Sequence, residues 1–379
     1  MKTRRMIRIT ALLLAILTAG AVGAQESVSE AVKPFVDRGV FPGLVSVTAD
    51  KDGHLTAESV GWSDIESSEP MTMDSVFWIA SMTKGVVGAG LLILVDEGLV
   101  DLDASVETYL PEFANIRVAE PGENGVLVLR SPKTKLTVRQ VMCHMGGLRF
   151  ITPAMERYGI DVFPARALAT SMVDVPLFAD PGTQFSYSNL GIDVGAAIIE
   201  AVTGFPFEEF LKKRIFDPLQ MYDTSFWLTD EQNARLVTPY KVLDGRCIPD
   251  TTNNLAYPFT DRQHRFAEGG GGLFSTPRDI IKFYQMIAGK GQYRGKRILS
   301  EEAVQTMATK QTPNGIDDPY SVGMWTDGEW IWHGGALGTE GRANIKTGEA
   351  RIYMVQLTSS VDPKIKEAWT AVCNARAAK

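Results

Sequence analysis

Cysteine is scarce in this chain of 379 residues, which contains only Cys143, Cys247 and Cys373. Disulfide bonds therefore cannot be its main stabiliser, because an odd number leaves at least one thiol unpaired. Whether any two of the three are bridged stays open. The pair Cys143-His144 suggests a thiol nucleophile, but adjacent residues seldom face one another on a helix. We interpret Cys143 as a residue that fills the core.

Histidine and basic residues are also few. The four histidines are His54, His144, His264 and His333. Their spacing is not that of metal ligands, which disfavours zinc hydrolysis, and we predict neither a metal nor a cofactor. No Gly-x-Ser-x-Gly occurs, which disfavours a hydrolase with a Ser-His-Asp triad. Acidic residues outnumber basic ones by 45 to 38, which argues against nucleic acid as a partner.

Beyond its N-terminus the chain has no long hydrophobic run. The first residues combine a basic stretch with apolar and small residues up to Ala24. We therefore predict a signal peptide over residues 1–24 and an exported protein, periplasmic or secreted, with the Sec and twin-arginine routes both open. No later run approaches the roughly 18 residues that span a bilayer, so we expect no stable membrane insertion after cleavage.

The remaining residues, 25–379, predict a single domain of the α+β or α/β class. Apolar alternation predicts strands near both ends of the chain, and amphipathic segments predict helices between them. The predicted strands are 44–49, 55–61, 320–326, 329–332, 342–345 and 351–357. The predicted helices are 26–38, 85–99, 138–143, 191–203, 207–216, 277–288 and 363–376. We expect one antiparallel sheet from about 25–75 and 290–379, with a helical region inserted at about 85–285.

Ser81-Met82-Thr83-Lys84 is the only Ser-x-x-Lys in the chain, and it lies where a helix begins. Residues three apart share a helix face, so the Lys84 ammonium can reach the Ser81 hydroxyl. A serine hydroxyl needs a base before it becomes a good nucleophile, and a desolvated lysine can take that role. The alternative interpretation is a helix cap followed by a solvated lysine.

Two further groups of residues accompany Ser81. Tyr187-Ser188-Asn189 is the only Tyr-x-Asn, and it combines a phenol that can act as a general base or acid with an amide that can bind a carbonyl. His333-Gly334-Gly335 ends a predicted strand, and its glycines would let a substrate approach backbone N–H groups. In isolation each group is equally well explained as a polar turn or a simple strand exit.

Lys346-Thr347-Gly348 is a literal Lys-Thr-Gly, the third motif of many enzymes that recognise β-lactams. It lies in a short polar break between two predicted strands, however, where a lysine would point to solvent. We predict that it forms a hairpin turn and assign the third position to His333.

The order Ser81-x-x-Lys84, Tyr187-x-Asn189, His333-x-Gly335 resembles that of the serine hydrolases related to class C β-lactamases. This family includes D-alanyl-D-alanine carboxypeptidases and carboxylesterases. The resemblance extends over nearly the whole mature chain, through blocks that lie between the motifs. These blocks include 98–103, 109–113, 136–140, 144–148, 215–219 and 269–279. The resemblance implies the β-lactamase-like, penicillin-recognising fold.

The resemblance also implies roles for the matching positions. Ser81 would be the acylated nucleophile, Lys84 its proton acceptor or electrostatic partner, and Tyr187 the base in acylation. The backbone N–H groups of Ser81 and Ala336 would form the oxyanion hole. The substrate would be bound by Asn189, His333, Gly334 and Gly335.

The sequence gives less information about the substrate class than about the fold or the reactive groups. His333 stands where class C β-lactamases carry a lysine, and a mostly neutral imidazole attracts a substrate carboxylate less than an ammonium does. We therefore favour a carboxylic ester over a D-alanyl-D-alanine peptide or a β-lactam. The partner expected is a small-molecule or peptide acyl substrate. A non-catalytic binding protein would be expected to lack Lys84, Tyr187 or Asn189, and none is missing.

Overall fold

The structure is a computed structural model that describes residues 27–251, 255–358 and 363–377. The predicted signal peptide, residues 1–24, lies outside the described residues. Within the described residues no single helix is long and apolar enough to cross a membrane, and one bent helix pair meets the criterion by length and composition alone. All three cysteines are free, so the bridge that the sequence left open is absent.

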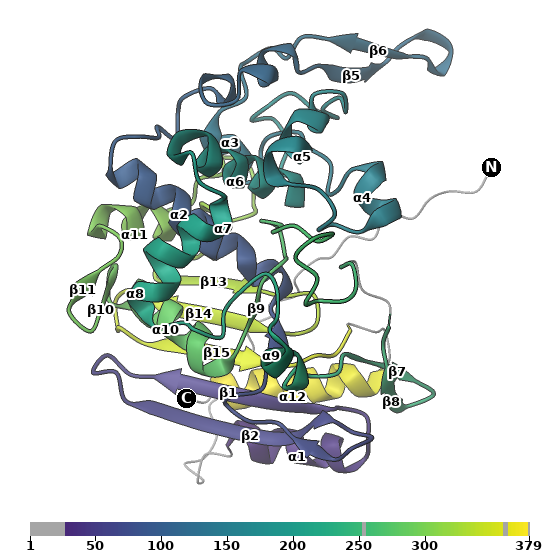
Figure 1. Cartoon of the computed structure of the whole chain (residues 1–379), viewed down its shortest axis with the longest axis vertical. Helices are drawn as coiled ribbons and strands as arrows, with labels where there is room; N and C mark the ends of the chain where they lie inside the picture. The colour runs from purple at the N-terminus through teal and green to yellow at the C-terminus, as the bar shows by residue number, and fades with distance from the viewer. Residues whose placement is uncertain (1–26, 252–254, 359–362, 378–379) are drawn as a thin grey trace.

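A seven-stranded antiparallel sheet joins the two ends of the chain (Figure 1). In spatial order its strands are β12 (Trp325–Thr326), β13 (Trp330–Gly334), β14 (Glu340–Asn344), β15 (Ala350–Met354), β1 (Gly43–Ala49), β2 (Leu55–Asp64) and β3 (Glu69–Pro70). N-terminal β1 pairs with C-terminal β15, with Val47 opposite Ile352. The predicted sheet from both chain ends is therefore confirmed.

Helices cover both faces of this sheet. They are α10 (Pro277–Ala288) on one face and α1 (Val28–Asp37) with α12 (Pro363–Ala377) on the other. Successive side chains of a strand point to opposite faces, so the buried residues of β15 divide between two cores. Ile352 and Met354 join the main core under α10, whereas Tyr353 packs with the terminal helices.

Of the remaining helices, α8 and α9 lie near the sheet in Figure 1, and the others form the part of the molecule above it. The remaining helices are α2 (Thr83–Asp96), α3 (Val138–Met142), α4 (Pro153–Tyr158), α5 (Ala165–Met172), α6 (Asn189–Thr203), α7 (Phe207–Leu211), α8 (Asp217–Leu219), α9 (Asp230–Ala234) and α11 (Glu301–Ala308). Most match the predicted helical region, but α11 lies in the part of the chain predicted to form the sheet.

Short strand pairs also lie within or beside the predicted helical region. They are β4 (Phe77–Trp78) with β9 (Phe274–Ser275), β5 (Val118–Pro121) with β6 (Leu127–Arg130), and β7 (Tyr240–Leu243) with β8 (Arg246–Pro249); β10 (Gln292–Tyr293) with β11 (Lys296–Arg297) lies just beyond it. Strands of two to four residues are too short to show a clear alternation. The strand predicted at 320–326 is wrong for most of its length, because Gly323 turns there with φ +73° and bonds to Met142 on α3.

Helix α2 lies at the centre of the molecule and carries the predicted nucleophile at its start. Its residues from Thr83 to Leu94 are all buried, so this helix is apolar on every side rather than amphipathic. Gly88 lets the backbone of Val322 approach closely, since a Cβ there would lie 2.5 Å from the Val322 carbonyl oxygen. This tight packing fixes the position of α2 against the segment that leads into β12.

Candidate active site

Ser81 lies in a sharp turn between β4 and α2. The turn is a single 3₁₀ segment, Ala80–Met82, and Ala80 has φ +45°, a strained conformation for a residue with a Cβ. Strand β4 holds the entry to this turn by pairing with β9, and Ile79 N–H donates to Leu273 O at 3.0 Å. Ser81 is only partly buried, so its hydroxyl is accessible at the start of a rigid helix.

Lys84 is fully buried and reaches three acceptors. Its Nζ lies 3.1 Å from Ser81 Oγ and 2.8 Å from Asn189 Oδ1, and it also donates to the carbonyl oxygen of Gly270. Among the described residues it forms no ion pair with a carboxylate. The structure therefore brings the predicted nucleophile and its predicted proton acceptor into direct contact, as the Ser-x-x-Lys spacing predicts.

Tyr187 is adjacent to Lys84 but bonds elsewhere. The Lys84 Nζ lies 4.7 Å from the centre of the Tyr187 ring, which is close enough for a cation–π contact. The Tyr187 hydroxyl is 3.3 Å from His333 Nε2, and no hydrogen bond to Ser81 is found within the described residues. As the base in acylation, Tyr187 would have to reach the Ser81 hydroxyl, but among the described residues only Lys84 forms a side-chain hydrogen bond with that hydroxyl.

His333 is a buried, neutral acceptor. Its Nδ1 lies 2.7 Å from Gly334 O, and because a carbonyl can only accept, Nδ1 carries the hydrogen and Nε2 is bare. The Tyr320 hydroxyl, at 3.1 Å, donates to Nε2 in addition to Tyr187. Burial, and then the nearby Lys84, lowers the pKa of His333 to about 3. Its imidazole is therefore uncharged at neutral pH and accepts hydrogen bonds from the hydroxyls of two tyrosines.

Asn189 links Lys84 to a second buried group. It lies at the start of α6, where its Oδ1 accepts from Lys84 and its Nδ2 donates to Glu268 Oε1 at 3.1 Å. Asn189 as a whole is 5% exposed. The predicted contact between Asn189 and the substrate stays a prediction, because the observed bonds of this amide are to the protein interior.

The loop after β13 is fastened to the nucleophile turn. Gly335 N–H donates to Thr339 O at 2.7 Å, and Thr339 Oγ1 donates to Ile79 O at 3.2 Å. A Cβ on Gly335 would lie 2.5 Å from Ile79 O, so only glycine allows this approach. Ala336 is the next residue and is exposed. The two backbone groups predicted to form the oxyanion hole, those of Ser81 and Ala336, thus lie on segments that are packed together.

Known proteins share this architecture. The family model described as Beta-lactamase matches residues 28–373. The chain belongs to the beta-lactamase family. An uncharacterized protein of Mycobacterium tuberculosis is 30% identical over 293 residues, covering 73% of this chain and 70% of that protein. The lovastatin esterase of Penicillium rubens is 29% identical, and the alignment covers 66% of this chain and 65% of the esterase.

The solved structures agree on the fold. Simvastatin synthase from Aspergillus terreus superposes with a TM-score of 0.76 at 23% identity, covering 93% of this chain and 95% of that one. The β-lactamase-like fold that the sequence predicts is therefore confirmed. Together with its esterase and acyltransferase relatives, the family identifies the chain as a β-lactamase-like serine hydrolase.

In this beta-lactamase family member Lys346-Thr347-Gly348 lies outside the site. It forms the turn between β14 and β15, and the exposed Lys346 pairs with Glu329. The hairpin prediction is therefore confirmed, and the motif is a coincidence of sequence.

Replacement of Lys346 by alanine is expected to leave kcat/KM within about threefold, because exposed ion pairs contribute little. Loss of an active-site cation would cost about 2–4 kcal/mol in transition-state stabilisation. The matched control is Lys51→Ala, which removes another exposed lysine at a neighbouring hairpin tip. A hundredfold loss in steady-state kinetics at Lys346 alone would contradict the assignment.

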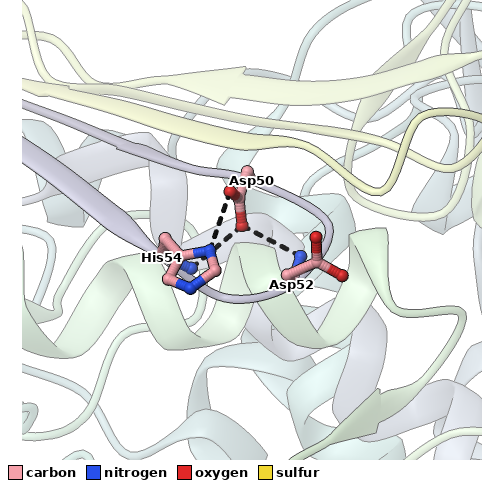
Figure 2. A group of neighbouring side chains, drawn as sticks. All are labelled: Asp50, Asp52 and His54. Atoms are coloured by element: carbon pink, nitrogen blue, oxygen red, sulfur yellow. Dashed lines mark hydrogen bonds and ion pairs between the residues drawn. The ribbon is translucent and has the colours of Figure 1, made fainter.

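A second polar cluster lies at the tip of the hairpin between β1 and β2. Figure 2 shows Asp50, Asp52 and His54 there, all exposed. The Asp50 carboxylate accepts hydrogen bonds from the backbone N–H groups of Asp52 and His54, both at 2.9 Å, and from the His54 ring at 3.0 Å. Because these bonds close the turn, we interpret the cluster as structural and assign it no ligand.

Three residues of the site were not predicted from the sequence: Glu268, Asp193 and Tyr320. The two acids have a signal in hindsight. Glu268 immediately precedes Gly269–Gly272, and Asp193 is the only acid in the first two turns of a largely apolar helix. Tyr320 carries no local signal, because its role depends on the folded position of His333.

Proposed function

We propose that this chain is an exported serine hydrolase that acts through an acyl-enzyme on Ser81 and prefers carboxylic esters. The observation that carries the proposal is the contact of the buried Lys84 Nζ with the Ser81 hydroxyl. The basic and then apolar N-terminus supports export.

The proposed reaction has two steps. In acylation the Ser81 oxygen attacks the ester carbonyl, its proton passes to the unit formed by Lys84 and Tyr187, and that unit returns a proton to the departing alcohol. In deacylation a water molecule loses a proton to the same unit and attacks the acyl carbonyl, which releases the acid and restores the Ser81 hydroxyl. Backbone N–H donors at Ser81 and Ala336 would stabilise each oxyanion, with about 3 kcal/mol for each donor.

The preference for an ester is supported by the state of His333. A β-lactam or a D-alanyl-D-alanine peptide carries a carboxylate that a site can hold with a cation. Here the imidazole is neutral and already accepts hydrogen bonds from two phenols. The relative named lovastatin esterase is in line with ester hydrolysis. The alternatives are a D-alanyl-D-alanine carboxypeptidase or a β-lactamase, and a non-catalytic protein of the same fold.

Intact-mass spectrometry of the protein with three acyl donors tests the proposal. The donors are short-chain esters, a D-alanyl-D-alanine peptide and a cephalosporin, with Ser81→Ala as the control. We expect a transient adduct of the acyl mass with an ester and faster turnover of esters than of the other two. An adduct and turnover with the peptide or the cephalosporin alone would reverse the substrate class, and no adduct with any donor would favour the non-catalytic alternative.

A further inference from the structure

Two buried carboxyl groups lie behind Lys84 without a role in the chemistry above. Asp193 and Glu268 are 1% and 2% exposed. Glu268 Oε1 accepts from Asn189 Nδ2 at 3.1 Å, and Asp193 Oδ1 accepts from Gly269 N–H at 2.9 Å. The second oxygen of each group is buried and has no hydrogen-bond partner among the described residues. Orphaned buried oxygens of this kind need an explanation.

The fold places both acids close to Lys84. Asn189 and Asp193 are four residues apart on α6 and so share a face of that helix. Glu268 precedes the glycine loop whose Gly270 carbonyl accepts from Lys84. A Cβ on Gly270 would lie 2.6 Å from Glu268 Oε1, so the loop is glycine-rich because it packs against this carboxyl.

The charges in this region require a balance. Lys84 is fully buried, and among the described residues no carboxylate is bonded to it directly. A positive charge on its ammonium would therefore need a counter-charge, because an uncompensated buried charge is costly. Two ionised acids would leave one surplus negative charge, and two neutral acids would leave Lys84 unbalanced. One proton on the pair makes the three groups neutral together.

The other titratable groups around Lys84 do not supply the missing charge. Asp161 is paired with Arg265 at 2.6 Å, and both are buried, so their charges cancel. Burial, and then Lys84, lowers the pKa of His144 and of His333 below their usual range, so both imidazoles are neutral. The hydroxyl of Tyr187 is bonded to one of these imidazoles.

We propose that Asp193 and Glu268 together carry one proton and one negative charge, and that this pair is the counter-charge of Lys84, held in place through Asn189. The two acids are then positioning residues for the acyl-enzyme chemistry on which this inference rests. Burial supports the assignment: it raises the pKa of Asp193 to about 7, and burial with the neighbouring Asp193 raises that of Glu268. Two acids that interact so closely titrate as a unit.

Infrared spectroscopy counts the proton without any need for catalysis. We expect wild-type protein at neutral pH to show the carbonyl stretch of a protonated carboxyl in difference spectra against Asp193→Asn and against Glu268→Gln. In each single variant the remaining acid takes the negative charge, so the band disappears. The matched control, Asp279→Asn, removes a buried carboxylate that pairs with Lys282 and should keep the band. A wild type without the band, or a band that survives in both single variants, would overturn the proposal.

The dependence of kcat/KM on pH tests the counter-charge in the protein that turns over. Each single variant retains one negative charge, so the rising limb of its profile should move less than that of the double variant. The double variant removes the negative charge of the pair, and loss of a nearby negative charge favours the neutral form of a base, so the rising limb of the profile should move to lower pH by about one unit or more. A double variant with an unmoved profile would refute the role.

One further comparison separates positioning through Asn189 from charge balance. Glu268→Ala removes the acceptor for Asn189, whereas Glu268→Gln retains it, so kcat should fall at least about tenfold further in the alanine variant at similar KM. Equal losses in the two variants would contradict positioning through Asn189.

If the double variant does not fold, the infrared result on the single variants decides. If no substrate acylates Ser81, the proposed function fails while the infrared test of the pair still stands.

Discussion

Ser81→Ala is expected to abolish turnover and to prevent labelling by a serine-directed phosphonate. Removal of a serine nucleophile typically costs about a millionfold in kcat, because the remaining groups only bind and polarise the substrate. The substitution deletes one partly buried hydroxyl in the turn before α2, so the fold should survive. Steady-state kinetics with an ester and intact-mass detection of the phosphonate adduct measure the two effects.

The control for this prediction is Ser171→Ala. Ser171 lies near the end of α5, and its hydroxyl donates to Leu168 O within that segment, so its removal should leave both readouts unchanged. Burial raises the pKa of the Cys143 thiol to about 12, so this cysteine stays protonated and should not be labelled. Labelling that survives in Ser81→Ala, or moves to Cys143, would remove Ser81 as the nucleophile.

Tyr187→Phe is expected to lower kcat by about 10²–10⁴-fold with little change in KM, because it removes proton transfer and leaves the shape of the pocket. Lys84→Ala should be at least as damaging, since Lys84 contacts the nucleophile directly at 3.1 Å. The double variant should lose much less than the sum of the two in free energy, as expected of residues that act as one unit. Pre-steady-state acylation rates of the three variants measure this coupling.

The structure supplies a matched control for the phenol. Tyr320 and Tyr187 both donate to His333 Nε2, but Tyr320 is fully buried. Tyr320→Phe removes a hydrogen bond of the same kind, and should affect acylation far less if the Tyr187 hydroxyl is the group that moves the proton. Additive losses at Lys84 and Tyr187, or a Tyr187→Phe enzyme that acylates at the wild-type rate, would show that Tyr187 is not the base.

Local sequence patterns predict much of the fold. The hairpin of β1 and β2 follows from apolar alternation on either side of Asp52-Gly53, and α10 spans the residues that its amphipathic pattern predicted, Pro277–Ala288. These patterns can be recognised because a strand or helix of seven or more residues repeats the spacing of its apolar residues more than once. The contact of Lys84 with Ser81 is equally local, because a three-residue spacing in a helical turn brings the two side chains together.

Only the tertiary structure decided how the rest of the site is connected. The Tyr187 hydroxyl bonds to His333, and Asn189 joins Lys84 to Glu268, although these partners lie 146 and 79 residues apart in the chain. The neutral state of His333 and the raised pKa values of the two buried acids come from loss of water around them, which no local pattern reports. The sequence by itself therefore determined the types of reactive group and their order, whereas packing determined their partners and their charges.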